Sequence, residues 1–197
     1  MKYKTGKLIS LLCICCLSLL FLSSNSLAQQ RILFDQKLKT IDGNNFNFSE
    51  LASNKASIIV FLLPDCPACE NYSKNFNEFH EKYSEAGIKL YGVFPGPYGK
   101  PEEMRAYQRR YKIRFPLLRD PDKMIVSLLG AVISPEVFLL DNKARILYQG
   151  RVDDWMYAPG KKRREARTHD LKNAIEEFLQ GKEIQVKKTR AIGCIIE

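Results

Sequence analysis

The chain has 197 residues, of which 45% are hydrophobic and 27% are charged, and its formal net charge is +9. A chain of this length can bury an adequate core, and it contains no internal repeat or low-complexity block. Its basic residues form no glycine-rich or aromatic–basic repeats, so the composition argues against nucleic-acid binding.

The first 28 residues have the pattern of a secretory signal. Lysines at positions 2, 4 and 7 precede an almost entirely apolar run over residues 8–22, and residues 26–28 resemble a cleavage site. The alternative is a retained membrane anchor, but this run has 15 residues, against roughly 20 for a spanning helix. We therefore expect residues 1–28 to be removed and the protein to be periplasmic or extracellular, with no stable membrane span.

Export would place the chain in an oxidising compartment, which makes its cysteines informative. Cys13, Cys15 and Cys16 lie inside the apolar run, where we expect them to act as apolar side chains. Residues 29–197 keep 28 basic and 22 acidic residues, a net charge of +6, and three cysteines. An odd number of cysteines outside the cytosol requires an explanation, because one of them is left over after any internal pairing.

The first predicted elements alternate between strand and helix. Residues 31–51 have the pattern of a β-hairpin with Asp42-Gly43 as its turn. Residues 57–63 form a continuous apolar run, typical of a strand that is buried on both faces. Residues 68–84 carry aromatic side chains at helical spacing, and residues 88–94 give the next strand.

The second half of the chain begins with a turn-rich loop. After it we predict a helix at 101–111, a strand at 115–118, a short helix at 122–129, a hairpin of strands at 137–140 and 145–148, and a last helix from a cap near Thr168 to a stop at Gly181. The early β/α alternation implies parallel strands, and the late hairpin adds antiparallel ones. We therefore predict an α/β fold with a central mixed sheet flanked by helices, followed by a tail at residues 182–197.

The strongest functional signal is Cys66-Pro67-Ala68-Cys69, between the apolar strand and the first long helix. This order puts Cys66 at a helix N-terminus, where unpaired N–H groups and the helix dipole favour the thiolate over the thiol. The thiolate attacks in disulfide exchange, and a second thiol three residues on can complete the exchange. Cys66 and Cys69 are therefore our predicted catalytic pair, a role that requires accessible sulfurs.

Two other uses of this pair are a static structural disulfide and half of a metal site. Zinc is disfavoured, because residues 29–197 contain no second C-x-x-C motif and no H-x-x-x-H motif. We expect no metal and no organic cofactor, since electrons can pass through the sulfurs alone.

This layout resembles the thioredoxin superfamily, and within it the redoxin branch that includes AhpC/TSA peroxiredoxin relatives and exported TlpA-like thiol–disulfide oxidoreductases. The resemblance covers about residues 31–181 and depends on the strand leading into the C-x-x-C motif, the segment at 133–138, and the closing hairpin plus helix. It implies that Pro135 is a cis-proline beside the active-site sulfurs. It also implies that Ser134 presents its backbone to a bound polypeptide, so both residues are expected to bind substrate.

The chain departs from the thioredoxin pattern in three ways. The separation from Cys69 to Pro135 is longer, as expected if residues 95–115 are the extra β/α insertion of the TlpA-like branch within a domain spanning 29–181. Thioredoxins have Trp before the first cysteine, whereas this chain has Asp65, whose carboxylate opposes thiolate formation. The buried acid of thioredoxin has no counterpart on the apolar strand.

The resemblance implies an exported thiol–disulfide oxidoreductase that exchanges Cys66 and Cys69 with protein thiols and disulfides, including those of a redox partner protein. The first alternative is a thiol peroxidase. That enzyme needs Pro-x-x-x-Thr/Ser-x-x-Cys, and the corresponding residues here are Ile59 and Leu63. The second alternative is a Cu(I) carrier using the two cysteines and His169, although exported copper-binding relatives of this fold use a wider cysteine spacing.

Cys194 is a possible accessory thiol. It lies 13 residues beyond Gly181, a reach of up to ~43 Å for extended chain. A 150-residue domain has a radius of gyration of only about 15 Å. The tail can therefore bring Cys194 to the active site as a resolving or exchange partner. The alternatives are an inert or intermolecular thiol, and a metal ligand.

Four further features have less specific interpretations. We expect His80 to be packed or half-exposed on the first long helix, and His169 to have a local capping role. The basic run at residues 161–164 is interpreted as a solvated loop face. The apolar residues 155–157 either pack under the second hairpin or form a docking surface for a partner protein.

Overall fold

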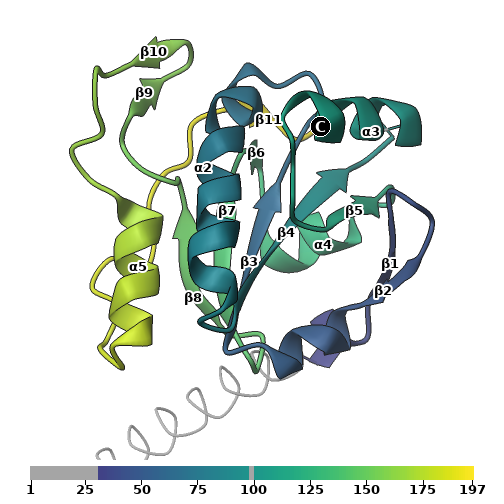
Figure 1. The fold of residues 1–197 in the computed structure, drawn as a ribbon, viewed down its shortest axis with the longest axis horizontal. Coiled ribbons are helices and arrows are strands. Elements are labelled where there is room, and N and C mark those ends of the chain that lie inside the picture. Colours follow the sequence, from purple (N-terminus) through teal and green to yellow (C-terminus); the bar gives the residue numbers. More distant parts are fainter. Residues whose placement is uncertain (1–30, 98–99) are drawn as a thin grey trace, which may run out of the picture.

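A seven-stranded mixed sheet forms the centre of the fold in the computed structural model, which describes residues 31–97 and 100–197 (Figure 1). The strand order is β2-β1-β5-β4-β3-β7-β8. The strands are β1 (Lys37–Thr40), β2 (Asn45–Asn47), β3 (Ala56–Phe61), β4 (Ile88–Pro95), β5 (Leu117–Asp120), β7 (Val137–Asp141) and β8 (Ile146–Gly150). The predicted signal segment, with Cys13, Cys15 and Cys16, lies outside the described residues.

The three inner strands β3, β4 and β5 are parallel, while β7 pairs antiparallel with β3 and β8 antiparallel with β7. The N-terminal hairpin is joined to the other edge, where β1 pairs antiparallel with β5. This mixed pattern confirms the predicted α/β sheet.

Strand β3 shows why its sequence has no alternation of apolar and polar residues. Ile58 and Val60 point into one core cluster, and Ile59 and Phe61 point into a second cluster on the opposite face of the sheet. All four side chains are buried, because a strand covered on both sides needs apolar residues at every position.

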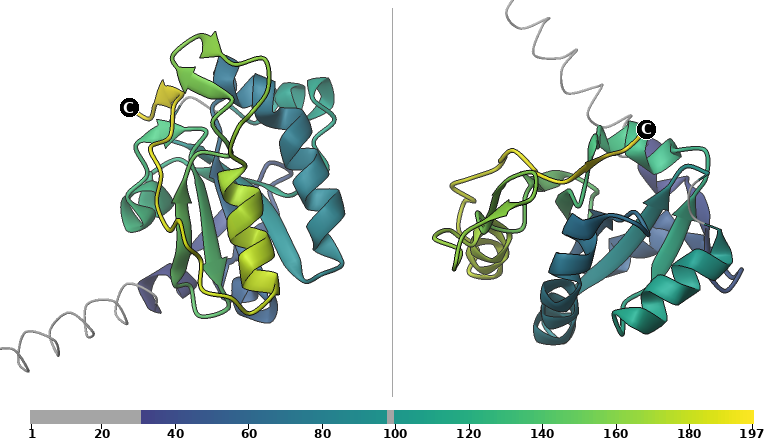
Figure 2. Two further views of the ribbon diagram at one scale, coloured as in Figure 1. Left: turned by 90° about the vertical axis from the view of Figure 1, so that its left-hand side faces the viewer. Right: turned by 90° about the horizontal axis from the view of Figure 1, so that it is seen from above.

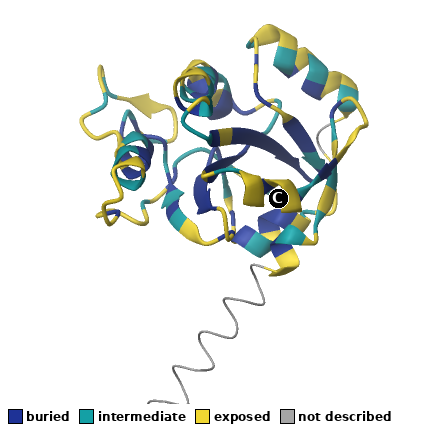
Figure 3. Cartoon of the chain, turned by 60° about the horizontal axis from the view of Figure 1, so that its bottom comes forward, coloured by how far each residue is buried: buried dark blue, intermediate teal, exposed yellow. Residues whose placement is uncertain are grey.

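Helices cover both faces of the sheet (Figure 2). On one face lie α2 (Pro67–Ser84), α3 (Pro101–Arg110) and α5 (Asp170–Leu179), whose buried side chains share a cluster with Ile58. On the other face lie α4 (Met124–Leu129) and the 3-10 helix η1 (Phe48–Ser53), whose buried side chains share a cluster with Ile59. Strands β3 and β7 are buried along their whole length, whereas exposed residues lie on the outer faces of the helices, in the loops and on the outer strands of the sheet (Figure 3).

Two predicted element starts are shifted, each for a local reason. Strand β5 begins after Pro116, which has no N–H to donate and pairs only through its carbonyl, to Gly92 N–H. Helix α4 begins later than predicted, at Met124, because the Asp120 carboxylate accepts hydrogen bonds from the N–H groups of three residues in its first turn. The prediction of Thr168 as the last helix cap was wrong by one residue, since His169 occupies that position.

The segment predicted as a tail packs along the domain (Figure 2). Gln149 N–H donates to Lys187 O at 2.9 Å, and Thr189 N–H donates to Gln149 O at 2.9 Å. Further on, a short strand β11 (Cys194–Ile195) pairs antiparallel with β6 (Ile133–Ser134). A second small hairpin, β9 (Met156–Ala158) with β10 (Lys161–Lys162), was also absent from the sequence-based prediction.

Candidate active site

Cys66 is the N-cap residue of α2, in extended conformation just outside the helix. Pro67 occupies the first helical position, where its missing N–H is not needed and its fixed φ suits the helix. Glu70 N–H donates to Cys66 O at 3.0 Å, which forms the first helical hydrogen bond. The strand-to-helix connection thus holds the Cys66 sulfur at the positive end of an 18-residue helix, as predicted.

Cys66 forms a disulfide with Cys194, with 6.1 Å between the two Cα atoms. Cys194 reaches this position as part of β11, where it lies opposite Ser134 in the antiparallel register. In this structure the accessory cysteine is therefore neither free nor intermolecular, and it is bonded to the first cysteine of the motif.

Cys69 is a free thiol, one turn into α2, and its side chain is fully buried. Its Sγ lies 3.0 Å from Ser134 Oγ. Since the Ser134 hydroxyl donates its one proton to Phe61 O at 2.9 Å, the Cys69 thiol is the donor to Ser134 Oγ. Desolvation raises the pKa of Cys69 to about 11, against the smaller opposing effect of the Ser134 hydrogen bond. Cys69 is therefore protonated at neutral pH.

Ser134 contacts both sulfurs of the motif. Its carbonyl oxygen lies 3.3 Å from Cys66 Sγ, while its hydroxyl oxygen meets Cys69. The peptide bond between Ser134 and Pro135 is cis, as the resemblance implied. The structure therefore brings together all five residues that the sequence analysis selected as site residues: Cys66, Cys69, Ser134, Pro135 and Cys194.

The expectation of accessible sulfurs does not hold for this form of the protein. Cys66 is 2% exposed and Cys69 is 0% exposed. Cys194 and its neighbours cover Cys66, because they lie on β6 and form one wall of the hollow next to it, whereas Cys69 is buried in the core cluster on the α2 side of the sheet. Pro64, Asp65 and Pro95 form the opposite wall, and Asp65 is exposed to solvent there.

Glycine at position 193 is required for this close approach. A Cβ atom at that position would lie 2.1 Å from Ser134 O and 3.1 Å from Pro135 Cδ. The sequence analysis missed Gly193, as it missed the whole pairing of β6 with β11. The only signal in the sequence is a glycine directly before the last cysteine.

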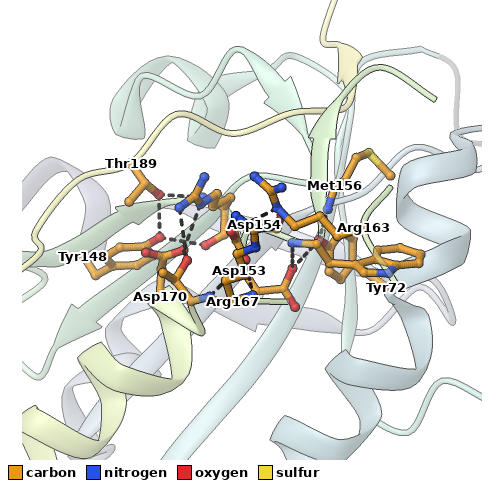
Figure 4. A network of polar contacts seen from close by, with 12 residues as sticks. Tyr72, Tyr148, Asp153, Asp154, Met156, Arg163, Arg167, Asp170 and Thr189 are labelled. Atoms are coloured by element: carbon orange, nitrogen blue, oxygen red, sulfur yellow. Dashed lines mark hydrogen bonds and ion pairs between the residues drawn. The ribbon is translucent and has the colours of Figure 1, made fainter. Parts of the chain in front are cut away.

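A polar network fastens the C-terminal segment to the rest of the domain (Figure 4). Thr189 Oγ1 lies 2.6 Å from the buried Tyr148 hydroxyl and accepts a hydrogen bond from Arg151 N–H at 3.1 Å. Arg151 in turn pairs with the Asp170 carboxylate on α5 at 2.8 Å. The network links the segment to β8 and α5, which explains why the predicted tail is ordered along the sheet edge.

Two of the three apolar residues at 155–157 pack against the domain, whereas Tyr157 is 47% exposed. Met156 is buried, and the Trp155 ring makes an edge contact with Tyr72 of α2 at a centroid distance of 5.7 Å. Tyr72 donates to the Asp153 carboxylate at 2.5 Å, which holds this segment against the helix. Within the basic run, the Lys162 ammonium lies over the Trp155 ring, 4.8 Å from its centroid. Lys162 is therefore in contact with the domain as well as exposed to solvent.

The two histidines lie away from the sulfurs. His80 is half-buried beside the Phe115 ring, with no hydrogen-bond partner at Nδ1, and desolvation lowers its pKa. His169 lines a surface hollow with Asn75 and Lys172. Among residues 31–97 and 100–197, no group of three or more potential ligands could hold a metal ion. No helix in the same residues is long and apolar enough to cross a membrane.

A parallel β-α-β unit with a C-x-x-C motif at the helix start, facing a cis-proline that precedes an antiparallel strand, defines a redoxin with a thioredoxin-like fold. The chain belongs to the AhpC/TSA family, which matches residues 30–149.

Individual proteins and structures are similar to this chain. A Mycobacterium tuberculosis protein named as a candidate peroxiredoxin is 26% identical over 94 residues, which cover 48% of this chain and 58% of that relative. The structure of a hypothetical protein from Sinorhizobium meliloti 1021 has a TM-score of 0.74 and 26% identity, covering 83% of this chain and 91% of that one. The thioredoxin domain of a thiol–disulfide oxidoreductase from Bacteroides vulgatus has a TM-score of 0.57 and 17% identity, covering 73% of this chain and 92% of that one. It shows likeness of fold alone.

Proposed function

We propose that the protein is a thiol–disulfide oxidoreductase that exchanges disulfides with protein partners through Cys66. The observation that carries this proposal is the position of Cys66: it caps α2, it is already in a disulfide, and the free thiol of Cys69 lies on the next turn. Ser134 contacts both sulfurs and, with Pro135, supplies the backbone edge on which a partner segment can lie.

In the oxidised form described here, a partner dithiol can be oxidised. A partner thiolate attacks Cys66 Sγ, the bond to Cys194 breaks, and Cys194 leaves as a thiolate. The partner's second thiolate then attacks the partner sulfur that is bonded to Cys66. The partner leaves with its own two sulfurs joined in a disulfide, and Cys66 leaves as a thiolate. The two electrons of the partner dithiol are then held by the Cys66 and Cys194 sulfurs, and the two protons that the partner thiols release to solvent balance the protons that these thiolates take up when they become thiols.

In the opposite direction, a partner disulfide is reduced. The Cys66 thiolate attacks the partner's disulfide and forms a mixed disulfide, and the first partner sulfur leaves as a thiolate. Cys69 then loses its proton and attacks Cys66, which releases the second partner sulfur. Cys194 can afterwards displace Cys69 from Cys66, and this last exchange regenerates the bridge of the structure.

Trapping of the mixed disulfide tests this mechanism. With Cys69→Ala and with serine at positions 13, 15, 16 and 194, the full chain keeps Cys66 as its only cysteine. It should accumulate a stable adduct through Cys66 when it is mixed with a synthetic peptide that contains a disulfide. The same chain with Cys66→Ser in addition should form no adduct. Failure of the first chain to form any adduct would overturn the proposal.

Export of the protein and of its partners is part of the proposal. It is supported by the basic, apolar and small-residue pattern of residues 1–28. Cells that produce the full chain should yield an envelope or secreted form that begins near residue 29. Mass spectrometry of that form is the test, and a cytosolic chain that retains residue 1 would contradict it.

A thiol peroxidase is the second candidate, because the M. tuberculosis relative is named as a candidate peroxiredoxin. The residues at the corresponding positions, Ile59 and Leu63, have no polar side-chain group with which to bind peroxide. Consumption of hydrogen peroxide in the presence of a thiol donor distinguishes the two activities. We expect disulfide exchange to be the faster reaction.

A further inference from the structure

The end of the chain lies in the active site as an added β-strand. Cys194 is opposite Ser134 and Ile195 is opposite Ile133, in antiparallel register. One residue further on, Ile196 N–H donates to Val132 O at 3.0 Å. Main-chain hydrogen bonds of this kind are how extended peptides bind to an exposed strand edge.

The side chains of this strand alternate between the core and solvent. Ile192 and Cys194 pack against the core cluster on the α2 side, and Ile196 packs against the cluster on the other face. Ile195, between them, is 70% exposed. The side chains that pack on the domain are therefore those of alternate residues, as in strand-addition recognition, where pockets for alternate side chains give specificity.

Gly193 adds a steric requirement to this pattern. It has no side chain to place between the backbone of the segment and Ser134, where a Cβ atom would be only 2.1 Å from the carbonyl oxygen. Any larger residue directly before the cysteine would push the strand off β6, and the sulfur would move away from Cys66 with it.

We propose that residues 192–196 occupy the partner site as a built-in substrate, and that the site therefore selects partner cysteines by their neighbours. The selected partner is an extended segment with glycine directly before the cysteine and an aliphatic residue two positions after it. This inference rests on the proposed function and extends it to the class of substrate. It also makes the C-terminal segment a competitor for β6, which a partner displaces from that edge as it attacks the bridge or after the bridge is reduced.

A set of short peptides tests the selection. The protein is the full chain with serine at positions 13, 15, 16, 69 and 194, so that Cys66 is its only cysteine. Each peptide copies residues 190–197 and carries its cysteine as a disulfide with 5-thio-2-nitrobenzoate. The Cys66 thiolate attacks the peptide sulfur, the bond to the aromatic thiol breaks, and the released thiolate is followed by its absorbance.

The peptides differ at one position each. A Gly193→Val peptide and an Ile196→Thr peptide should react about tenfold more slowly than the native sequence, because each loses contacts or backbone hydrogen bonds to β6. The control is an Ile195→Thr peptide, which changes only the exposed side chain, adds no charge and should react within about twofold of the native sequence. Equal rates for all four peptides would overturn the inference.

The failure of this inference can be told apart from failure of the proposed function. If Cys66 reacts with the small disulfide 5,5′-dithiobis(2-nitrobenzoate) but treats all four peptides alike, only the sequence selection is overturned. If Cys66 reacts with neither the small disulfide nor the peptides, the proposed function is overturned as well.

The competitor role is tested within the protein itself. In the same chain, adding Gly193→Val should release the segment from β6 and raise the reaction rate with the native peptide several-fold, since a tethered occupant competes at high effective concentration. Adding Val186→Thr instead changes an exposed side chain outside residues 192–196 and should leave that rate unchanged. An unchanged rate with Gly193→Val, in a protein whose thermal unfolding is unaltered, would overturn this role.

Discussion

Cys194 is bonded to Cys66, 128 residues earlier in the chain, and covers the sulfur to which it is bonded. One contact therefore has two effects: it closes residues 66–194 into a covalent loop, and it shields Cys66 from solvent. Reduction of this single bond removes the loop closure and leaves the segment held on β6 by non-covalent contacts alone. Stability and accessibility of the site are thus coupled through one disulfide.

The first prediction concerns stability. We expect Cys194→Ser to lower the free energy of unfolding by about 2–5 kcal/mol without reductant, because a bridge across a long loop restricts the unfolded chain. Urea denaturation measures this difference. Dithiothreitol should bring the wild-type protein to the level of the variant and leave the variant unchanged. If the two proteins unfold at the same urea concentration without reductant, the bridge does not stabilise the fold.

The second prediction concerns pH. Burial raises the pKa of Cys69 to about 11, so its thiolate fraction increases with pH over the whole range below that value. In a chain with serine at positions 13, 15, 16 and 194, whose Cys66 carries 5-thio-2-nitrobenzoate, release of the aromatic thiol by Cys69 should accelerate about tenfold per pH unit between roughly pH 7 and 9.

The matched control for this experiment is the same chain with Cys69→Ala, which should release no aromatic thiol at any pH in that range. A rate that levels off near pH 8 would mean that Cys69 ionises like an exposed thiol, contrary to its full burial.

The third prediction concerns the hydroxyl group of Ser134. This hydroxyl lies 3.0 Å from Cys69 Sγ. It accepts from the neutral thiol while it donates to Phe61 O, and once Cys69 is ionised it can turn the same proton to the thiolate, which lowers the pKa of Cys69 relative to burial alone. Ser134→Ala should therefore raise the pKa of Cys69 further and slow its attack on Cys66 at neutral pH. Titration of the thiolate absorbance in the ultraviolet measures the shift, in a chain with serine at positions 13, 15 and 16.

Ser57→Ala is the control for that change. Ser57 is also fully buried, but its hydroxyl accepts from the Asn54 side chain at 3.0 Å instead of contacting a sulfur. The Ser57→Ala change should therefore leave the pKa of Cys69 unchanged. An identical titration in the Ser134→Ala variant would show that the hydroxyl does not stabilise the thiolate.

The parts of the fold that were predicted from sequence have local causes. The apolar run of β3, the helical spacing of aromatic residues in α2, and Pro67 at the first helical position each act within one element. These local signals predict that Cys66 lies at the start of α2, and they need no information from the rest of the chain. The cis bond before Pro135 was inferred from resemblance, since its cause is the packing of residues distant in sequence.

The bridge and the C-terminal strand could not be predicted in the same way. The entropy of closing a loop depends only weakly on its length, so sequence separation does not tell which of two nearby cysteines Cys194 joins. A two-residue strand such as β11 carries almost no periodic signal. Its position is fixed by non-local contacts: the Gly193 backbone against Ser134 and the Thr189 hydroxyl against Tyr148.

The last prediction tests those non-local contacts. Thr189→Val keeps the shape of the side chain but removes the hydroxyl next to Tyr148 and the acceptor of Arg151 N–H. Because the Tyr148 side chain is fully buried, the loss should cost about 1–3 kcal/mol in docking of the C-terminal segment. We expect faster reduction of the Cys66–Cys194 bridge by dithiothreitol, measured by alkylation and mass spectrometry.

Thr168→Val is the matched threonine control for this experiment. Its hydroxyl contacts the same Arg151 and Asp170 pair from an exposed position outside the C-terminal segment. Loss of that hydroxyl should leave the reduction rate near the wild-type value. If both variants accelerate reduction equally, the rate reflects general loosening around Arg151, and Thr189 does not specifically hold the segment over Cys66. Faster reduction in Thr189→Val alone would establish that a contact with β8, remote from the sulfurs, controls access to the site.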